Sequence, residues 1–115
     1  MITTAGYDRI LNGLAKGWTR GDHNAVLTYF ADDIVYTDGV YYSFAGKPEL
    51  AAFFEKDGAT PQFCEFKRSL FDEFAQLGCA EYVYRGTYNY FGTVWIRFKD
   101  GLITDWCEYQ HRSEA

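Results

Sequence analysis

The chain has 115 residues, enough for one domain (residues 1–115), and its net charge of -5 with scattered Lys and Arg excludes the clustered basic surface that nucleic acid requires. No apolar run approaches the ~20 residues of a membrane-spanning helix, and residues 1–6 lack the basic and hydrophobic regions of an export signal. We therefore expect a cytoplasmic protein whose partners are small molecules or other proteins, not nucleic acid or membrane.

Apolar residues recur at helical spacing in the first part of the chain: Tyr7, Ile10, Leu11, Leu14 and Trp18. This spacing predicts an amphipathic helix over residues 4–20 whose apolar face covers a sheet. Gly21 can end this helix, and Asp22 is a suitable N-cap for a second, short helix. The inward-pointing residues of the second helix are expected to be Val26, Tyr29 and Phe30.

The pattern changes at residues 30–39. Residues 30–33 end the helical part, and the β-branched and aromatic run Ile34–Thr37 predicts a strand. Asp38-Gly39 is a turn dipeptide, which would return the chain through residues 40–44 as a short hairpin.

A third helix is predicted over residues 48–57, because Pro48 suits the first helical position and Glu49 places an acid in the first turn. From Gln62 onward the apolar residues alternate with a period of two. The alternating runs are Phe63–Ala75, Cys79–Tyr88, Tyr90–Phe98 and Leu102–Gln110. We expect four long antiparallel strands in a meander that curls around the helices.

These elements predict an α+β fold in which a curved antiparallel or mixed sheet wraps around three helices. The outer face of the sheet also carries apolar and aromatic residues, which predicts a homodimer through that face. The residues expected there are Val83, Trp95, Cys107 and Tyr109. The residues expected in the core are Ile10, Leu14, Trp18, Val26, Phe30, Phe53, Phe66, Leu70, Val94 and Ile96.

Aromatic residues make up 20% of the chain, and 10 of them are tyrosines. A tyrosine combines an apolar ring with a polar hydroxyl, which suits the lining of a wet or ligand-filled cavity. The same residues would also serve in an ordinary core or interface, so composition leaves both interpretations open.

The cysteines and histidines point to no metal site, cofactor or nucleophile. Cys64, Cys79 and Cys107 are odd in number, widely spaced and placed in apolar or β-rich runs, so we expect free thiols. His23 and His111 have no partner at the spacing of a catalytic triad or metal site.

Alternation along the strands selects candidate pocket residues. Tyr82 and Tyr84 share one face of their strand, and Trp106, Glu108 and Gln110 share one face of the last strand. Glu108 is therefore either a solvated surface residue or an acid inside a pocket.

Asp38 allows two interpretations as well. An Asp before Gly is commonly a turn residue whose side chain caps nearby amides. However, Tyr36 and Asp38 share one face of the predicted strand, so Asp38 could instead be a buried base that points into a pocket.

Residues 30–38, preceded by Gly21-Asp22, resemble the nuclear transport factor 2-like superfamily, which includes ketosteroid isomerases, SnoaL-like polyketide cyclases and limonene-epoxide hydrolases. The resemblance implies a cone-shaped, cystatin-like fold in which this strand delivers a carboxylate or phenol into a conical pocket. In ketosteroid isomerases the general base lies at the residue matching Asp38. The isomerase oxyanion hole uses a Tyr and an Asp where this chain offers Leu14 and Val94.

Residues 101–109 are similar to the final strand of SnoaL-like proteins and of limonene-epoxide hydrolase. In the hydrolase an acid matching Glu108 helps to activate water, beside an Arg and an Asp at the positions of Tyr82 and Tyr84 in this chain. The resemblance therefore implies the fold and the two carboxyl groups, but neither of these mechanisms in its standard form.

Two functions follow as hypotheses. The first is a cofactor-independent acid–base enzyme (isomerase, cyclase, lyase or hydrolase) for a small apolar or aromatic substrate, with Asp38, Glu108 and Tyr36 as catalytic residues. The second is a non-catalytic domain of the same fold that binds a ligand or dimerises. The residues expected to bind the ligand are Trp18, Phe54, Tyr82, Tyr84, Val94 and Trp106.

Overall fold

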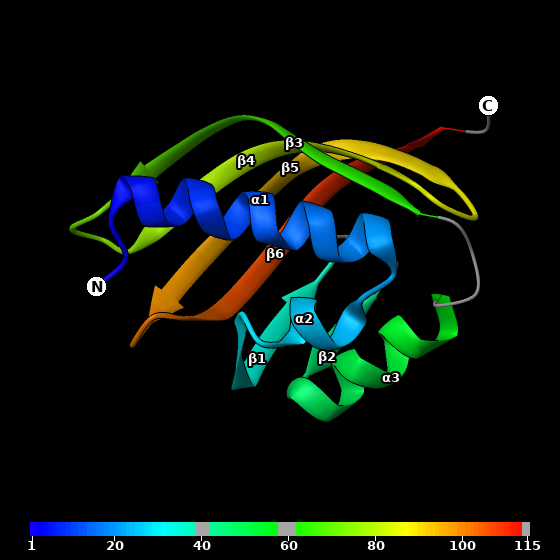
Figure 1. Ribbon diagram of the computed structural model, residues 1–115, viewed down its shortest axis with the longest axis horizontal. Helices are drawn as coiled ribbons and strands as arrows, with labels where there is room; N and C mark the ends of the chain where they lie inside the picture. The colour runs from blue at the N-terminus through cyan, green and yellow to red at the C-terminus, as the bar shows by residue number, and fades with distance from the viewer. Residues whose placement is uncertain (39–41, 58–61, 114–115) are drawn as a thin grey trace.

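The computed structural model describes residues 1–38, 42–57 and 62–113. Within these ranges the chain forms, in order, α1 (Thr4–Arg20), α2 (His23–Leu27), β1 (Phe30–Thr37), β2 (Ser43–Ala45), α3 (Lys47–Asp57), β3 (Phe63–Asp72), β4 (Leu77–Arg85), β5 (Asn89–Lys99) and β6 (Leu102–Ser113). The described strands form one sheet in the order β2-β1-β6-β5-β4-β3, and β1 runs parallel to β6 while the other neighbours are antiparallel. Figure 1 shows α1, α2 and α3 on one face of this curved sheet. The predicted α+β architecture and the meander of the last four strands are confirmed.

The first helix has the predicted bounds, and the second begins after the predicted N-cap. Thr3 caps α1 because its hydroxyl accepts the Gly6 N–H at 3.0 Å. Gly21 ends α1 in the left-handed conformation (φ 71°), which glycine adopts without a steric penalty. The Asp22 side chain caps α2 by accepting the Ala25 N–H at 3.2 Å.

The helical part of the chain ends earlier than predicted. α2 stops at Leu27, and β1 begins at Phe30 instead of Ile34. The reason is long-range pairing, because Ile103 of β6 lies opposite Phe30 and donates its N–H to the Tyr29 carbonyl at 2.9 Å. Tyr29 and Phe30 therefore leave the helix, and Phe30 enters the core from a strand.

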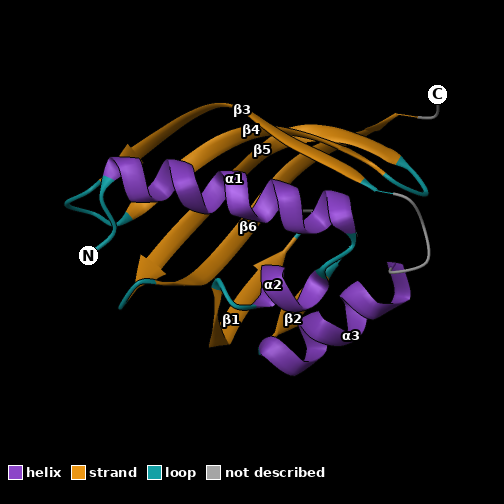
Figure 2. Cartoon of the chain, viewed as in Figure 1, coloured by secondary structure: helices purple, strands orange, loops and turns teal. Residues whose placement is uncertain are grey.

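Several strand ends also differ from the prediction, and β4 is displaced to Leu77–Arg85 from the predicted Cys79–Tyr88. β3 stops at Asp72 instead of Ala75, because the Asp72 carboxylate accepts the Ala75 N–H at 3.0 Å and turns the chain. The turn is held by the N-terminus, since Gln76 accepts the Ile2 N–H at 2.8 Å, and Figure 2 shows the two segments side by side. β6 extends past Gln110 because it stays paired with β5.

The predicted short hairpin is present as β1 and β2, which pair Val35 with Ala45 and Thr37 with Ser43. Its predicted turn residue Gly39 lies outside the described residues. Asp38 directly follows β1 and is buried.

The core lies between the helices and the sheet. Most of the residues predicted there are buried: Leu14, Trp18, Val26, Phe30, Val94 and Ile96. Others are partly buried and pack against this core: Ile10, Phe53 and Phe66. The prediction for Leu70 is wrong, because its side chain is 76% exposed.

A bulge in β3 explains the exposure of Leu70. Phe66 lies opposite Tyr82, whereas Ser69 lies opposite Ala80, so β3 contains one more residue than β4 between these pairs. An extra residue reverses the inward and outward alternation beyond it. Leu70 therefore points away from the helices, although it shares the parity of Phe66.

The outer face of the sheet carries none of the described helices (Figure 2) and exposes several aromatic residues. Trp95 is 47% exposed, Phe91 53% and Tyr109 63%. Cys79 and Cys107 flank Trp95 on the neighbouring strands. None of the helices in the described part of the chain is both long and apolar enough to cross a bilayer.

Paired leucine substitutions test the bulge. Leu14→Ala removes a fully buried side chain and is expected to lower the free energy of unfolding by roughly 2–5 kcal/mol. Leu70→Ala is expected to change it by less than about 0.5 kcal/mol. Urea unfolding of both variants measures the difference, and a large loss for Leu70→Ala would contradict the described register.

Candidate active site

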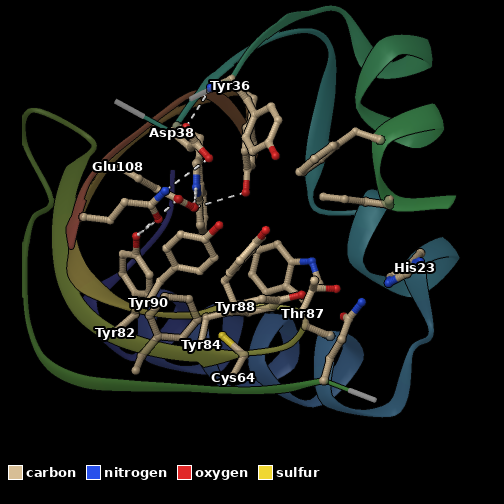
Figure 3. Close-up of a pocket in the computed structure, with 18 residues that line it drawn as sticks. His23, Tyr36, Asp38, Cys64, Tyr82, Tyr84, Thr87, Tyr88, Tyr90 and Glu108 are labelled. Carbon is tan, nitrogen blue, oxygen red and sulfur yellow. Dashed lines mark hydrogen bonds between the residues drawn. The ribbon is translucent and has the colours of Figure 1, made fainter. Parts of the chain in front are cut away.

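A cavity of about 230 Å³ lies between the helices and the sheet. Its deep end is polar and is formed by Tyr36, Asp38, Tyr82, Trp106, Glu108 and Gln110. Its rim carries more exposed residues, including Tyr42, Thr87 and Tyr88. Figure 3 shows the side chains of Tyr36, Asp38 and Glu108 turned toward a common space.

Strand register brings the polar groups together. The parallel pairing of β1 and β6 sets Tyr36 opposite Trp106, so the inward-facing positions that follow on the two strands, Asp38 and Glu108, lie near each other. The Tyr36 and Trp106 rings stack with centroids 5.7 Å apart and an interplanar angle of 4°. On the other side of β6, Tyr82 of β4 lies two strands away from Gln110.

Gly92 lies between Tyr82 and Gln110 and allows β5 and β6 to approach closely. It is the β5 residue between them in the register, and it has no side chain to fill the space. A Cβ atom at this position would lie 2.7 Å from the Gln110 Cα, which is closer than packing allows. The Tyr82 hydroxyl reaches across β5 to residues of β6.

Glu108 is held by side chains of β6 itself, of β1 and of β4. Its Oε1 accepts hydrogen bonds from the Trp106 indole N–H at 2.7 Å and from the Tyr36 hydroxyl at 3.1 Å. Its Oε2 lies 3.2 Å from the Tyr82 hydroxyl. These contacts settle the alternatives for its location, since Glu108 lies in the cavity lining rather than on the solvated surface.

A hydrogen-bond chain connects Glu108 with Asp38. The Tyr82 hydroxyl is 2.7 Å from Gln110 Oε1, which is closer than Glu108 Oε2. Gln110 in turn donates from Nε2 to Asp38 Oδ2 at 3.2 Å. Because the hydroxyl carries one proton, a Tyr82 that donates to Gln110 can accept a hydrogen bond from the neutral Glu108 carboxyl. The neutral form of Glu108 therefore completes the chain.

Burial raises the pKa of Glu108 to about 7, because the desolvated carboxylate is less stable than the neutral acid. The nearby negative charge of Asp38 also raises this pKa, whereas the hydrogen bonds that Trp106 and Tyr36 donate lower it. Burial and the Glu108 charge raise the pKa of both Tyr36 and Tyr82. These hydroxyls therefore stay neutral donors at physiological pH.

Asp38 fits both interpretations that the sequence left open, because it lines the cavity and also accepts a backbone N–H of the turn. Its side chain lines the cavity and is 6% exposed. Its Oδ1 also accepts the Tyr42 N–H at 2.8 Å, and its own N–H donates to the Tyr42 carbonyl at 2.9 Å. The two carboxyl groups of the cavity thus differ in environment, since Asp38 contacts amide donors and Glu108 contacts hydroxyl and indole donors.

Most residues expected to bind a ligand lie in the cavity lining: Trp18, Phe54, Tyr82, Tyr84 and Trp106. Val94 does not, because it is fully buried in the core between Ala80 and Glu108 in the register. Leu14 is likewise fully buried. The two positions that matched the isomerase oxyanion hole therefore serve packing.

Sequence reasoning missed several lining residues: His23, Tyr42, Phe53, Gln62, Cys64, Phe66, Thr87 and Tyr90. Cys64 and Phe66 face the same side of β3 as each other, but nothing in the sequence shows that β3 borders the cavity. The sequence shows that Gln110 and Glu108 lie on the same face of their strand. The hydrogen bond from Gln110 to Asp38 depends on the pairing of β1 with β6, which the sequence does not show. All three cysteines are free thiols, and burial raises the pKa of Cys64 to about 12.

A match of the amino-acid sequence to a family model identifies the family of this chain. A family model described as a SnoaL-like domain matches residues 11–106. This chain belongs to the SnoaL-like domain family. Among curated proteins, none matches its sequence.

Solved structures place the SnoaL-like chain among proteins of diverse function. An epoxide hydrolase of the LEH-like type from M. tuberculosis matches with a TM-score of 0.77 and 17% identity over 90% of this chain and 80% of its own. The Delta 5-3-ketosteroid isomerase from Mycobacterium sp. matches with a TM-score of 0.77 and 20% identity over 92% and 97%. A computationally designed 17-OHP binder matches with a TM-score of 0.77 and 18% identity over 90% and 95%. At these identities the likeness shows the fold alone.

The raised pKa of Glu108 predicts a pH-dependent stability. Between the ordinary pKa of 4.5 and the folded value of about 7, the native state keeps a proton that the unfolded chain releases. The free energy of unfolding should therefore fall as pH rises through this window, by up to about 1.4 kcal/mol per pH unit. Glu108→Gln should flatten this decline.

Denaturant unfolding at pH 5, 6, 7 and 8 measures the effect. The matched control is Asp33→Asn, which neutralises an exposed carboxylate of β1 and should leave the decline unchanged. Carbon-detected NMR of the side-chain carboxyls gives an independent reading, and a Glu108 that titrates near 4.5 would contradict the assignment.

Proposed function

We propose that the cavity is the active site of a cofactor-independent acid–base enzyme, either an isomerase, a cyclase, a lyase or a hydrolase, that acts on a small apolar or aromatic molecule. The observation that carries this proposal is the environment of Glu108, whose pKa of about 7 lets it exchange protons near neutral pH. A second carboxyl group, Asp38, lies in the same cavity in a different environment. Such a pair suits separate acid and base roles.

In this proposal Glu108 is the general acid. Below about pH 7 it is neutral and can give its proton to a ligand oxygen or carbon. Trp106 and Tyr36 donate to Oε1 and stabilise the carboxylate that remains. Tyr36 therefore acts through Glu108 as a positioning residue, and Asp38 is the general base.

The size of the cavity limits the substrate. Its volume of about 230 Å³ is below the roughly 300–1,000 Å³ of pockets for drug-sized ligands. The aromatic rings of Trp18, Phe54 and Tyr84 line much of it. We propose a substrate of one or two rings, smaller than a steroid.

The pH profile of turnover tests the role of Glu108. With substrates drawn from a panel of small epoxides, unsaturated ketones and aromatic ketones, kcat/KM should fall as pH rises above about 7, since the acid loses its proton. Glu108→Gln should lower kcat by roughly 10²–10⁴-fold. Asp33→Asn should leave kcat unchanged, and equal turnover by Glu108→Gln and wild type would refute the proposal.

The alternative is a ligand-binding domain without catalysis. It is favoured by the bond from the Tyr42 N–H to Asp38, which is the contact of a turn-capping residue. The designed 17-OHP binder is an example of a binding protein with this fold. Ligand binding by wild type without turnover of any panel member would support this alternative.

We also propose a homodimer through the outer face of the sheet, where Phe91, Trp95 and Tyr109 are exposed. Light scattering at micromolar concentration should give about twice the chain mass of 13.3 kDa. Trp95→Glu should give the monomer, because a charge opposes burial of the apolar face. Phe74→Glu, at a residue that is 95% exposed in the turn between β3 and β4, is the control and should stay dimeric.

A monomeric wild type would refute the dimer without affecting the catalytic proposal. The cytoplasmic location expected from the sequence stays a prediction.

A further inference from the structure

We infer that the cavity selects a small organic cation, such as an aromatic ammonium compound, over neutral and anionic molecules of the same shape. This inference names a ligand class for the same cavity and rests on the proposal that the cavity is a binding site. It concerns binding, which can be measured without turnover.

The charges of the cavity favour a cation. Asp38 and Glu108 are both in the lining, and none of the lining residues that the structure describes is a Lys or an Arg. The nearby cation Arg112 lies behind the lining, over the Tyr88 ring at 4.4 Å. The basic residue among them is His23 of α2, at the partly exposed rim. A cleft lined by one sign of charge concentrates ligands of the opposite sign.

The ring faces of the lining favour a cation as well. The rings of Trp18, Phe54 and Tyr84 border the cavity. Aromatic faces carry partial negative charge and attract ammonium groups, most strongly where water is excluded.

The hydrogen-bond donors of the deep end are already engaged with protein acceptors. The Trp106 and Tyr36 donors bond Glu108, and the Tyr82 hydroxyl bonds Gln110. An anionic ligand would have to displace these bonds and would face the Asp38 carboxylate. A quaternary ammonium ligand needs no donor and gains from both the carboxylates and the rings.

Cation binding should be coupled to the protonation of Glu108. A positive ligand beside this carboxyl favours its ionised form, so affinity should rise as pH increases from 6 to 8. Titratable groups from other elements face Glu108, namely Tyr36 from β1, Asp38 directly after β1, Tyr82 from β4 and Cys64 from β3. The phenols and the thiol stay neutral in this range because burial raises their pKa values.

Three probes of similar shape separate charge from hydrophobic burial. They are phenyltrimethylammonium, whose charge does not titrate, its uncharged isostere tert-butylbenzene, and benzoate. Trp18 and Trp106 line the cavity, so their fluorescence reports binding, and NMR shifts of residues in the lining locate it. At pH 8 the cation should bind wild type at least tenfold more tightly than tert-butylbenzene, and benzoate should bind more weakly than both.

Variants assign the preference to the two carboxyl groups. Asp38→Asn should weaken binding of the cation at least fivefold and leave tert-butylbenzene unchanged. Glu108→Gln should abolish the rise in cation affinity between pH 6 and 8. Asp33→Asn removes the same charge outside the cavity and should change neither quantity.

Binding of tert-butylbenzene as tight as that of the cation, or tighter binding of benzoate, would overturn this inference. Neither result would remove the acid–base proposal, which is judged by the turnover of Glu108→Gln. If a variant fails to give a folded NMR spectrum, the comparison of the three probes on wild type still decides.

Discussion

The parallel pairing of β1 with β6 is the constraint on which the cavity depends. It sets Tyr36 opposite Trp106, and the side chains two residues further along both strands then face the same space. A shift of one residue in this register would turn Asp38 and Glu108 to opposite faces of the sheet. The pairing also begins earlier than local propensity suggests, because Phe30 is already opposite Ile103. Long-range contacts therefore define both the start of β1 and the composition of the deep end.

Burial of Glu108 works against the stability of the fold. The cost of removing a carboxylate from water is reduced by the Trp106 and Tyr36 donors, and it is avoided when the group is protonated. An amide at this position would be less costly above pH 7, because it could still accept from these donors. A buried carboxyl group that lowers stability above neutral pH is more simply explained by a role in the cavity than by packing.

Gly92 illustrates how a missing side chain shapes the cavity. In a strand a glycine commonly marks a close approach of other groups, and here Tyr82 reaches Gln110 across it. Two residues further along β5, the Val94 side chain points to the same side and is fully buried in the core. The boundary between core and cavity on β5 thus lies between these two positions.

Local patterns in the sequence were enough to predict the class of fold, the bounds of α1 and the meander, because helical periodicity, caps and alternation depend on neighbouring residues. They also identified Tyr36, Asp38 and Glu108 as residues that share a face with other polar groups. The sequence could not show that Leu70 turns outward, since the bulge after Phe66 exists only in the pairing of β3 with β4. Nor could it choose between surface and cavity for Glu108, or link Gln110 to Asp38. Those outcomes required the tertiary structure, because alternation decides which side chains share a face, while only the order and register of distant strands decide which of them meet.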